Sequence, residues 1–507
     1  FNYADTFGRY RFFYRNPGHS TLEKLRTEDG YNGPLNDTGF TPFLDGDQTD
    51  FSAIVGLEGA FEGGTYYDFS LSKGSNELDY FLNNTINADL GLTGDLSIPQ
   101  MDFDVGGYKQ EEVNVNADFS TPVGDSLNVA YGGEWREETY TVIAGEANAY
   151  LGGGSSGFKG ITPQDSGKYA RDNYAVYVDV EQDATDELLV QYALRYEDYS
   201  DFGSTTNWKV AANYHLTDEV SLRGAVSTGF HAPTPGQSNI RTTITTFDGT
   251  TGAQIEEGLI PATDPRAVLA GGQAIKQEES TNLSFGVSSE LGSNTTLTLD
   301  FYQIEVDDRI YRTGNIGQAD GTSISFYTNA IDVKHSGFDL VVTSDIDWSG
   351  GLSTDVSLAY AYNKIEVTGQ RMVSGAQPVH DNTVEDIENN FPKSRFVLTT
   401  NTAFGDDWNL MLRANYYGSH YDERGEIGNP ADLSAQIGAI VYIDAQLTYQ
   451  LNDDVKLKLG FANMFDEYID EIDAPNANRQ SVGLQYPRRS AANYEGGSWY
   501  LGMAYSF

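Results

Sequence analysis

The sequence contains no cysteine among its 507 residues. Disulfide bonds and thiolate-bound metal centres are therefore excluded, although an oxidising compartment is permitted. Long apolar runs are missing as well, because no window approaches the roughly 18 consecutive apolar residues of a transmembrane helix. If such a chain crosses a membrane, it must do so as a closed β-sheet, since only helices and closed sheets satisfy their backbone groups in lipid.

Basic residues are scarce. The chain has 31 lysines and arginines against 74 aspartates and glutamates, which gives a formal net charge of −43. Nucleic acid is therefore excluded as a partner, because phosphate binding needs basic stripes. The negative charge is explained either by solubility in a saline environment or by an acidic funnel that repels anionic ligands.

The apolar share is only 39%, whereas aromatic residues reach 13% and 33 of them are tyrosines. Tyrosine suits positions that are apolar at one end and wet at the other, such as membrane interfaces. No linker or change of composition divides the chain, so residues 1–507 are predicted to form one large domain. No signal peptide precedes Phe1, and we expect that processing or truncation has removed the start.

The last ten residues show the pattern on which the fold prediction depends. Large apolar residues alternate with small or polar ones, and Tyr500 is the one bulky exception. The apolar members are Trp499, Leu501, Met503, Tyr505 and Phe507. A period of two indicates a strand with two different faces.

The same alternation recurs along the whole chain and predicts about seventeen strands. They are expected near residues 50–59, 66–72, 113–119, 127–135, 174–180, 188–196, 208–214, 220–230, 283–287, 297–301, 338–342, 356–362, 396–398, 408–416, 441–449, 455–461 and 498–507. Residues 10–14 are read as the end of another strand. Eighteen strands would close a barrel of porin size.

Two regularities favour a membrane. Short and long connections alternate, which places tight turns at one end of the sheet and long loops at the other. The face opposite each apolar stripe is polar, as with Asp444, Gln446 and Thr448, or Lys456 and Lys458. We therefore predict an all-β fold, an antiparallel transmembrane β-barrel. A complete 18-stranded passive porin and a soluble glycan-binding cell-surface β protein remain as alternatives.

Catalytic and metal-binding signals are weak. The six histidines show no ligand spacing, and no nucleophile elbow or paired catalytic carboxylates stand out, so neither an enzyme nor a metal or cofactor site is predicted. Residues 45–50 carry three aspartates but lack the closing glutamate of a calcium loop, and are read as an acidic loop end. The glycines of residues 152–157 follow no βαβ pattern and are read as a flexible loop.

Several short motifs resemble those of the TonB-dependent outer-membrane receptors. Residues 227–237 resemble the family's G-F-R-A-P-T stretch, with His231 in the usual arginine position. Residues 277–282 resemble P-E-x-S-x-N, residues 308–310 read D-R-I, and residues 463–466 are similar to N-L-F-D. Each motif is weak alone, but the ordered set is specific and covers most of the chain from about residue 39.

The resemblance implies a 22-stranded barrel that is filled by an N-terminal plug. Counting back from Phe507 makes residues 50–59 the sixth strand and residues 1–15 the end of the fifth. The chain would then hold strands 5–22. It would lack the signal peptide, the TonB box (the short segment that engages the TonB-type energy-transducing protein), the plug and about four strands.

The same resemblance implies a receptor in the outer membrane of a Gram-negative bacterium, surrounded by lipid and lipopolysaccharide. It would bind a scarce solute, such as a siderophore, vitamin, saccharide or peptide, and import it with energy from the inner membrane. Met503, Tyr505 and Phe507 resemble the family's signal for the barrel assembly machinery.

Solute binding is expected on the lumen wall and the long loops. The candidates are Arg136, Arg195, Arg223, Arg413, Tyr417, Tyr421 and Tyr468. The arginines are expected to pair first with carboxylates of neighbouring strands or of a plug, and only secondarily with a ligand.

Overall fold

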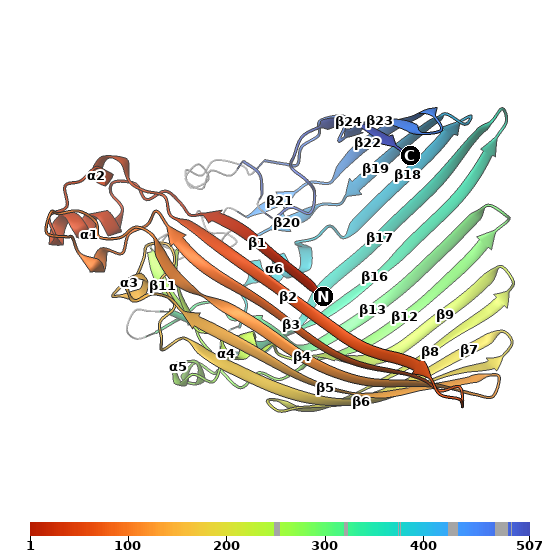
Figure 1. Ribbon diagram of the computed structural model, residues 1–507, viewed down its shortest axis with the longest axis horizontal. Coiled ribbons are helices and arrows are strands. Elements are labelled where there is room, and N and C mark those ends of the chain that lie inside the picture. Colours follow the sequence, from red (N-terminus) through yellow and green to blue (C-terminus); the bar gives the residue numbers. More distant parts are fainter. Residues whose placement is uncertain are drawn as a thin grey trace.

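The computed structural model describes residues 1–247, 254–318, 323–373, 375, 377–423, 434–471, 485–487 and 489–506. One antiparallel sheet of eighteen strands dominates this part of the chain (Figure 1). Its strands are β1 (Asn2–Arg11), β2 (Phe43–Ala60), β3 (Tyr66–Asn83), β4 (Phe103–Val123), β5 (Leu127–Ala144), β6 (Gly167–Thr185), β7 (Leu188–Tyr199), β8 (Gly203–Thr217), β9 (Val220–His231), β12 (Glu278–Leu291), β13 (Thr295–Arg312), β16 (Tyr327–Trp348), β17 (Leu352–Gln370), β18 (Ser394–Phe404), β19 (Trp408–Tyr417), β22 (Ile440–Asn452), β23 (Val455–Ala462) and β24 (Ser498–Tyr505).

Short elements fill the long connections. They are α1 (Ser20–Glu28), α2 (Leu35–Thr38), the 3-10 helix η1 (Ala88–Leu90), α3 (Ala147–Tyr150), α4 (Pro235–Asn239), β10 (Thr242–Phe247), β11 (Gln254–Leu259), α5 (Pro265–Leu269), β14 (Ile316–Gly317), β15 (Ser323–Ser325), α6 (Asp381–Asn389), β20 (His420–Asp422) and β21 (Ala435–Ile437). Among the described residues, no helix is both long enough and apolar enough to cross a bilayer.

The sheet is a meander in which each of its strands pairs with the next one along the chain. The sheet curls, so that β2 to β6 pass in front of β12 to β17 and enclose a lumen (Figure 1). In the described part of the chain, no ladder joins β1 to β24. The sheet therefore has two free edges, whose backbone groups need partners if they lie in lipid.

The two faces of the sheet differ in the way that the sequence predicts. On β6 and β7, Val176 and Leu194 are 58% and 49% exposed on one face, whereas Asn173 and Glu197 are 1% and 5% exposed on the other. The crowded polar face is the concave one, and the apolar stripes point outward. This arrangement is the reverse of a soluble sandwich, whose apolar faces meet in a dry interior.

The outward apolar stripe has the length that a bilayer requires. On β7 it runs from Leu188 through Tyr192 to Tyr196, close to the 9–11 residues or so of a tilted transmembrane strand. Aromatic rings lie toward both ends of this band, with Phe119 stacked on Tyr131 at 5.3 Å near the short turns. Such rings are typical of the two membrane interfaces.

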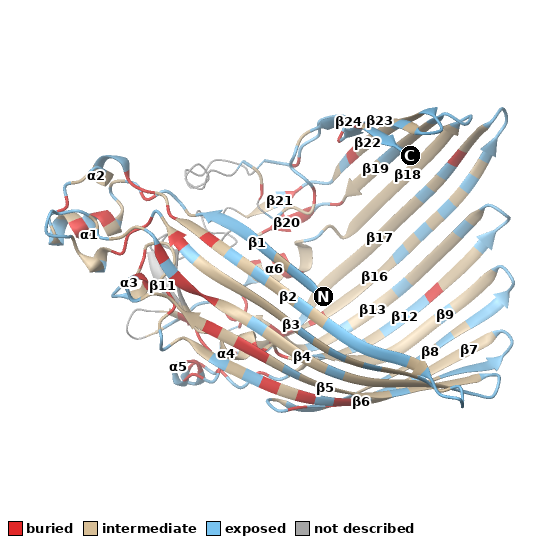
Figure 2. Ribbon diagram, viewed as in Figure 1, coloured by how far each residue is buried: buried red, intermediate tan, exposed pale blue. Residues whose placement is uncertain are grey.

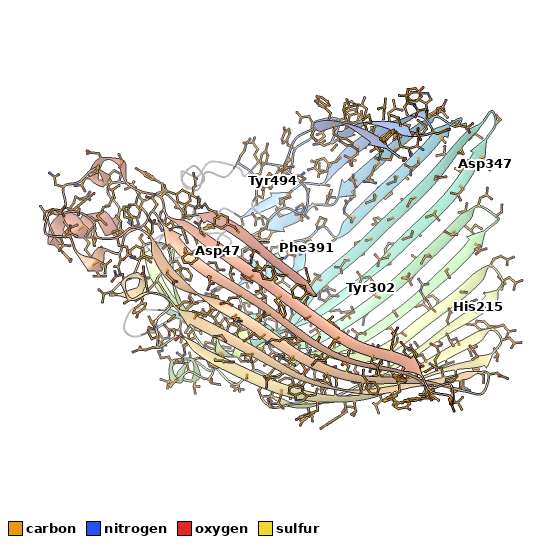
Figure 3. All side chains as sticks on the ribbon, in the orientation of Figure 1. Asp47, His215, Tyr302, Asp347, Phe391 and Tyr494 are labelled. Atoms are coloured by element: carbon orange, nitrogen blue, oxygen red, sulfur yellow. The ribbon has the colours of Figure 1, made fainter. Side chains whose placement is uncertain are left out.

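The connections alternate between short turns and long loops. The short turns are residues 61–65, 124–126, 186–187, 218–219, 292–294, 349–351, 405–407 and 453–454, and the long loops include residues 12–42, 84–102, 145–166, 232–277, 371–393 and 463–497. His215 and Asp347 mark the short-turn end and Tyr494 the long-loop end (Figure 3). Buried residues gather toward the long-loop end (Figure 2).

One connection departs from the predicted alternation. β7 and β8 are joined at the long-loop end by residues 200–202 alone, because both strands extend beyond their apolar stripes. Tyr199 is buried, and its ring stacks on Phe202 at 4.6 Å. The stacking holds a tight turn where the sequence pattern predicted a loop.

The prediction of an acidic loop end at residues 45–50 is wrong, because these residues lie inside β2. Asp45 accepts hydrogen bonds from Arg9 Nε on β1 at 2.6 Å and from Asn83 Nδ2 on β3 at 2.8 Å. Asp50 accepts one from Gln48 Nε2 at 2.9 Å. Polar partners on both neighbouring strands thus extend a strand whose sequence is turn-like.

The long loops have apolar cores of their own. Leu22, Leu25, Tyr31 and Phe40 from residues 12–42 pack against Ile86 from residues 84–102. Asp89 of η1 accepts a hydrogen bond from Gly153 N at 2.6 Å and pairs with Lys24. The hydrogen bonds from Lys24 and from the backbone of Gly153 hold the pKa of Asp89 below its usual range. Three loops thereby form one lobe beside the lumen mouth.

Tyr500, the bulky exception in the last strand, faces the lumen opposite Gly460. Its hydroxyl donates a hydrogen bond to Gln446 Oε1 at 2.7 Å. A Cβ at residue 460 would overlap the Tyr500 ring, so the glycine provides the space for the aromatic side chain.

We expect Gly460→Val to lower the free energy of unfolding by about 1–3 kcal/mol, because the valine displaces Tyr500 and breaks its hydrogen bond. Urea unfolding in lipid vesicles measures the change. The double variant Gly460→Val/Tyr500→Ala should lose less than the sum of the two single variants; strict additivity would refute the proposed contact.

Candidate functional site

A column of tyrosines lines the lumen near the long-loop end. Tyr80 on β3, Tyr108 on β4 and Tyr140 on β5 lie on the concave face. The rings of Tyr108 and Tyr140 are stacked at 6.1 Å, and Tyr80 meets Tyr108 edge-on at 6.3 Å. Just below Tyr140 is a cavity of about 250 Å³, lined by polar side chains and by Pro235 of α4. Tyr140 itself is buried against Val142 and Ile161, so this wall offers the half-buried rings of Tyr80 and Tyr108 together with the polar lining of the cavity.

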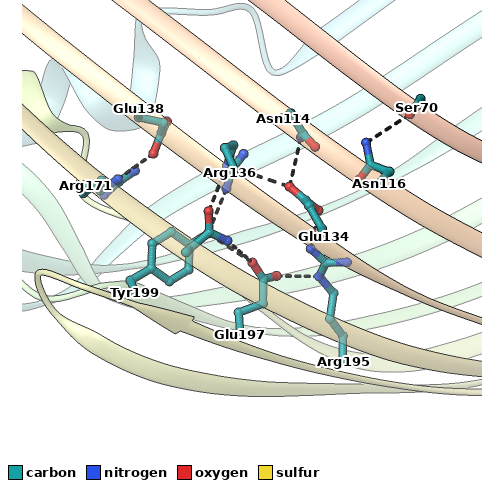
Figure 4. Close-up of polar contacts among 11 residues, drawn as sticks. Ser70, Asn114, Asn116, Glu134, Arg136, Glu138, Arg171, Arg195, Glu197 and Tyr199 are labelled. Carbon is teal, nitrogen blue, oxygen red and sulfur yellow. Dashed lines mark hydrogen bonds and ion pairs between the residues drawn. The ribbon is translucent and has the colours of Figure 1, made fainter. Parts of the chain in front are cut away.

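Below the tyrosines, arginines and glutamates of β5, β6 and β7 form a polar network (Figure 4). Arg195 Nη2 lies 2.8 Å from Glu134 Oε2, and Arg195 Nε lies 2.5 Å from Glu197 Oε1. Arg136 donates to Asn173 Oδ1 at 3.2 Å and to Tyr199 Oη at 3.0 Å. The predicted inward arginines 136 and 195 thus belong to one network.

Glu197 is the buried centre of this network. Besides Arg195, its carboxylate accepts hydrogen bonds from Tyr199 Oη at 3.1 Å and from Asn173 Nδ2 at 3.4 Å. A buried carboxylate is tolerated only when such donors compensate for its lost hydration. The network therefore stiffens the wall and leaves Arg136 and Arg195 already occupied.

Arg171, which the sequence did not single out, ties this wall to a long loop. Its Nε lies 2.5 Å from Glu138 Oε2, and its Nη1 donates to the carbonyl of Pro233. The guanidinium also lies over the Tyr199 ring at 5.2 Å. It fixes the start of residues 232–277 against the barrel wall, so its contacts are structural.

The other two predicted arginines differ from each other. Arg223 on β9 forms a two-pronged ion pair with Asp300 on β13, with Nε 2.8 Å from Oδ1. Gly286 on the strand between them leaves room for this pair. Arg413 on β19 donates from Nε to Thr399 Oγ1 at 3.3 Å and is exposed to the lumen.

The three predicted tyrosines lie apart. Tyr417 ends β19, where the Arg395 guanidinium lies 3.7 Å from its ring centre. Tyr421 on β20 is buried at 4% exposure, so its ring faces the packed loop interior. Tyr468 lies on residues 463–497 and is exposed. Arg395 had no signal in the sequence beyond being a charged residue in a strand.

Tyr468 belongs to a stack of three tyrosines on one long loop. Its ring lies parallel to that of Tyr486 at 6.0 Å, and Tyr486 lies parallel to Tyr494 at 6.0 Å. A hydrogen bond with Asp466 raises the pKa of Tyr468, so its hydroxyl stays protonated. Exposed, pre-stacked rings offer a flat surface to an aromatic or sugar ligand.

Three of the four motifs that resembled a known family meet in space, and the fourth forms a local clamp in its own loop. Glu278 of the second motif accepts a hydrogen bond from the backbone of Ile310 in the third at 2.9 Å, and His231 of the first lies 3.8 Å from the same carboxylate. Asn463 adopts a positive φ of 47°, and its side chain bonds the backbone of Glu467 in both directions. These residues shape strand ends rather than a binding surface.

Met503 and Tyr505, two residues of the predicted assembly signal, are exposed on the outward face of the edge strand β24. Phe507 lies outside the described residues. Among the residues that are described, no group of three or more histidine, aspartate and glutamate side chains is arranged to hold a metal ion.

His420 clamps two long loops together at the mouth. It is 1% exposed, its Nδ1 donates to the carbonyl of Gly418 at 3.1 Å, and its Nε2 accepts from Ala491 N at 3.2 Å. Because both nitrogens are used in this way, the ring must be neutral. Burial lowers the pKa of His420 below its ordinary value of 6.5.

This lowered pKa makes the clamp sensitive to acid. The unfolded loop takes up a proton first, so the clamp contributes fully above pH 6.5 and is lost as the pH falls toward the lower folded pKa. We expect amide exchange at residues 489–491 to accelerate below pH 6.5 in the wild type. His420→Gln, which cannot titrate, should exchange at a rate independent of pH after correction for intrinsic exchange; a parallel acid response in both proteins would contradict the assignment.

Comparison with known proteins identifies relatives of this barrel. The family model described as "TonB dependent receptor-like, beta-barrel" matches residues 1–464. A probable TonB-dependent siderophore receptor, PirA of Acinetobacter baumannii, is 22% identical over 87% of this chain and 57% of its own length. The vitamin B12 transporter BtuB of Photobacterium profundum is 22% identical over 62% of this chain and 43% of its own length.

The fold likeness agrees with the sequence likeness. The crystal structure of the siderophore receptor PirA from Acinetobacter baumannii superimposes with a TM-score of 0.59 at 16% identity, covering 95% of this chain and 66% of that one. The chain thus spans about half the length of the curated relatives that it matches.

Proposed function

Because this chain belongs to the TonB-dependent receptor β-barrel family, we propose that it is the barrel of an outer-membrane receptor that imports a small solute. The supporting observation is the curled antiparallel sheet with apolar stripes outside and polar side chains inside. Its matched relatives are receptors and transporters rather than enzymes. A Gram-negative outer membrane is where such a sheet has lipid on one face and water on the other.

The two ends of the barrel have different roles in this proposal. The long loops face the medium and meet the solute first, and the short turns face the periplasm, where a TonB-type protein supplies energy. The relatives extend well beyond the matched region. In this proposal the additional length contains a plug and the strands that pair with the free edges of β1 and β24. Since neighbours alternate in direction, the number of added strands must be even, and four would give a 22-stranded barrel.

The solute is proposed to contact the accessible aromatic surfaces. Tyr468 with its stacked neighbours lies on the loops, and the half-buried rings of Tyr80 and Tyr108 lie deeper, whereas Tyr140 is buried. Among the predicted residues, Arg413 and Tyr417 face the same lumen, whereas Arg136, Arg195 and Arg223 act by holding the wall. Siderophores, vitamins, saccharides and peptides all fit an aromatic and polar surface, and the relatives include a siderophore receptor and a vitamin transporter.

Uptake by the full-length protein tests the proposal. A deletion strain should lose high-affinity uptake of one labelled nutrient class, and the wild-type gene but not a gene lacking its TonB-engaging segment should restore it. Collapse of the proton gradient should abolish uptake. Uptake that survives this collapse, together with steady ion conductance in planar bilayers, would indicate a passive porin instead.

Tyr468→Ala should weaken solute binding by about 1–3 kcal/mol if its ring stacks on the solute, following what stacked bases lose on alanine substitution. Competition binding on whole cells measures the loss. Tyr174→Ala, which removes an exposed outward tyrosine from β6, is the matched control and should leave binding unchanged.

A further inference from the structure

The charges on the lumen wall are divided between two sides of the barrel. On the concave face of β2 to β7, carboxylates outnumber cations: Asp50, Glu58, Asp68, Glu112, Asp118, Glu134, Glu138, Asp179, Glu181 and Glu197 face Arg136, Arg171 and Arg195. Several of these carboxylates have only neutral donors among the described residues. Asp118 accepts from Tyr177 Oη at 2.7 Å and Asp179 from Gln191 Nε2 at 2.9 Å.

The other side of the lumen has the opposite balance. On the concave face of β18, β19, β22, β23 and β24, the cations are Arg395, Arg413, Lys456 and Lys458, and the only carboxylate on this face within the described part of these five strands is Asp444. The oxygens of Asp444 are engaged by Asn415 Nδ2 and by the backbone N of Asn463, each at 2.9 Å. No ion pair in the described residues involves Arg413, Lys456 or Lys458.

Three lysines on the outward face form ion pairs. Lys334 lies 3.1 Å from Glu305, Lys364 lies 2.6 Å from Glu366, and Lys109 lies 3.3 Å from Glu77. In a chain with 74 acidic and 31 basic residues, carboxylates are available for pairing almost everywhere. A basic wall of this kind, which faces an acidic wall across an enclosed space, is therefore a feature of the lumen.

We propose that this basic wall, made of Arg413, Lys456 and Lys458, is the docking face for a carboxylate-rich surface of the folded plug segment that precedes Phe1 in the full-length protein. The inference rests on the proposed function and adds to it the polarity and the orientation of the occupant. The plug carries its acidic face toward β19 to β23 and its basic face toward β3 to β7, because each wall disfavours a like charge.

The charge division also fixes how the occupant sits. A plug turned by half a revolution would place like charges against both walls, and repulsion in an enclosed lumen is screened less than at an open surface. Lys456 and Lys458 lie near the turn at residues 453–454, so their part of the contact is made at the short-turn end, whereas Arg413, opposite Asp444, lies farther toward the long loops. The part made by the two lysines lies beside the proposed site of energy input.

Carbodiimide coupling of the full-length protein in lipid vesicles tests the inference, since it joins an ammonium group to a carboxylate only when the two are in contact. Mass mapping is expected to find Lys456 or Lys458 joined to a carboxylate upstream of Phe1. The outward pairs Lys334 with Glu305 and Lys364 with Glu366 should react in the same sample and serve as the internal control.

A charge reversal gives an independent readout. In Lys456→Glu/Lys458→Glu, the upstream segment should become accessible to protease and the channel should leak ions, whereas the outward variant Lys364→Glu should remain closed. If the channel is closed and the control pairs react, but neither lysine couples upstream, the docking inference is overturned and the receptor proposal stands. If the wild-type protein conducts ions without a protected upstream segment, the receptor proposal itself is overturned.

Discussion

Glu197→Ala should lower the free energy of unfolding by about 1–3 kcal/mol, because it leaves buried hydrogen-bond donors without their acceptor. The carboxylate is 5% exposed and accepts from Arg195, Tyr199 and Asn173. Its removal leaves the Arg195 guanidinium with Glu134 alone and the Asn173 amide without this acceptor. The loss would be measured by urea unfolding in lipid vesicles.

The next residue along the strand provides the matched control. Asp198 carries the same charge, but it faces outward and is exposed, so Asp198→Ala should change stability by less than about 0.5 kcal/mol. Removing both partners in Glu197→Leu/Arg195→Met should restore part of the loss, because the guanidinium that lost its acceptor is then absent and Glu134 keeps Arg136 at 3.8 Å. If both alanine variants lost the same free energy, the inward network would have no special role.

Much of the barrel could be predicted because one face of each strand meets lipid and the other meets the lumen. Apolar and polar residues therefore alternate along the strand. On β22, Ile443, Ala445 and Leu447 follow one face and Asp444 and Gln446 the other. Tight turns such as Asn452 to Val455 carry their own signal, since the Asn452 side chain accepts from the backbone of the following residues at 3.0 and 2.9 Å. Local chemistry thus determines both the strand and its end.

Elements that depend on distant partners escaped prediction. The sequence of residues 45–50 is turn-like, and it becomes part of a strand through its pairing with β1 and β3, from which Arg9 and Asn83 bond Asp45. α1 is stabilised by Phe40 and Ile86 from elsewhere in the chain, so its short pattern is not decisive alone. The extension of β7 depends on the buried ring of Tyr199.

The candidate site shows the same limit. An inward arginine predicts that a carboxylate lies near it, but does not identify that carboxylate. Arg195 pairs with Glu134, which is 61 residues away in the sequence. Burial of Tyr421 follows from β20 and β21 packing in a long loop, which no periodic pattern reveals. Conversely, the exposure of Tyr468 agrees with its place in a loop rich in polar residues.

Leu447→Arg tests the outward assignment of the apolar stripe most directly. Leu447 lies between Leu410 on β19 and Leu459 on β23 on the outer face. An arginine placed there faces hydrocarbon, which should cost about 2–4 kcal/mol of folding free energy if the position lies near the bilayer midplane. Folding into vesicles of defined thickness, followed by urea titration, measures the cost.

The adjacent residue separates this effect from a general intolerance of charge on β22. Gln446 faces the lumen, where it bonds Tyr500 and Thr448, so Gln446→Arg should lose little more than that hydrogen bond, about 0.5–1.5 kcal/mol. Thinner bilayers should relieve Leu447→Arg, because the guanidinium then reaches the interface more easily, and should leave Gln446→Arg unaffected. Equal losses in the two variants at every thickness would mean that both side chains meet the same medium, and the sheet could then not separate lipid from water.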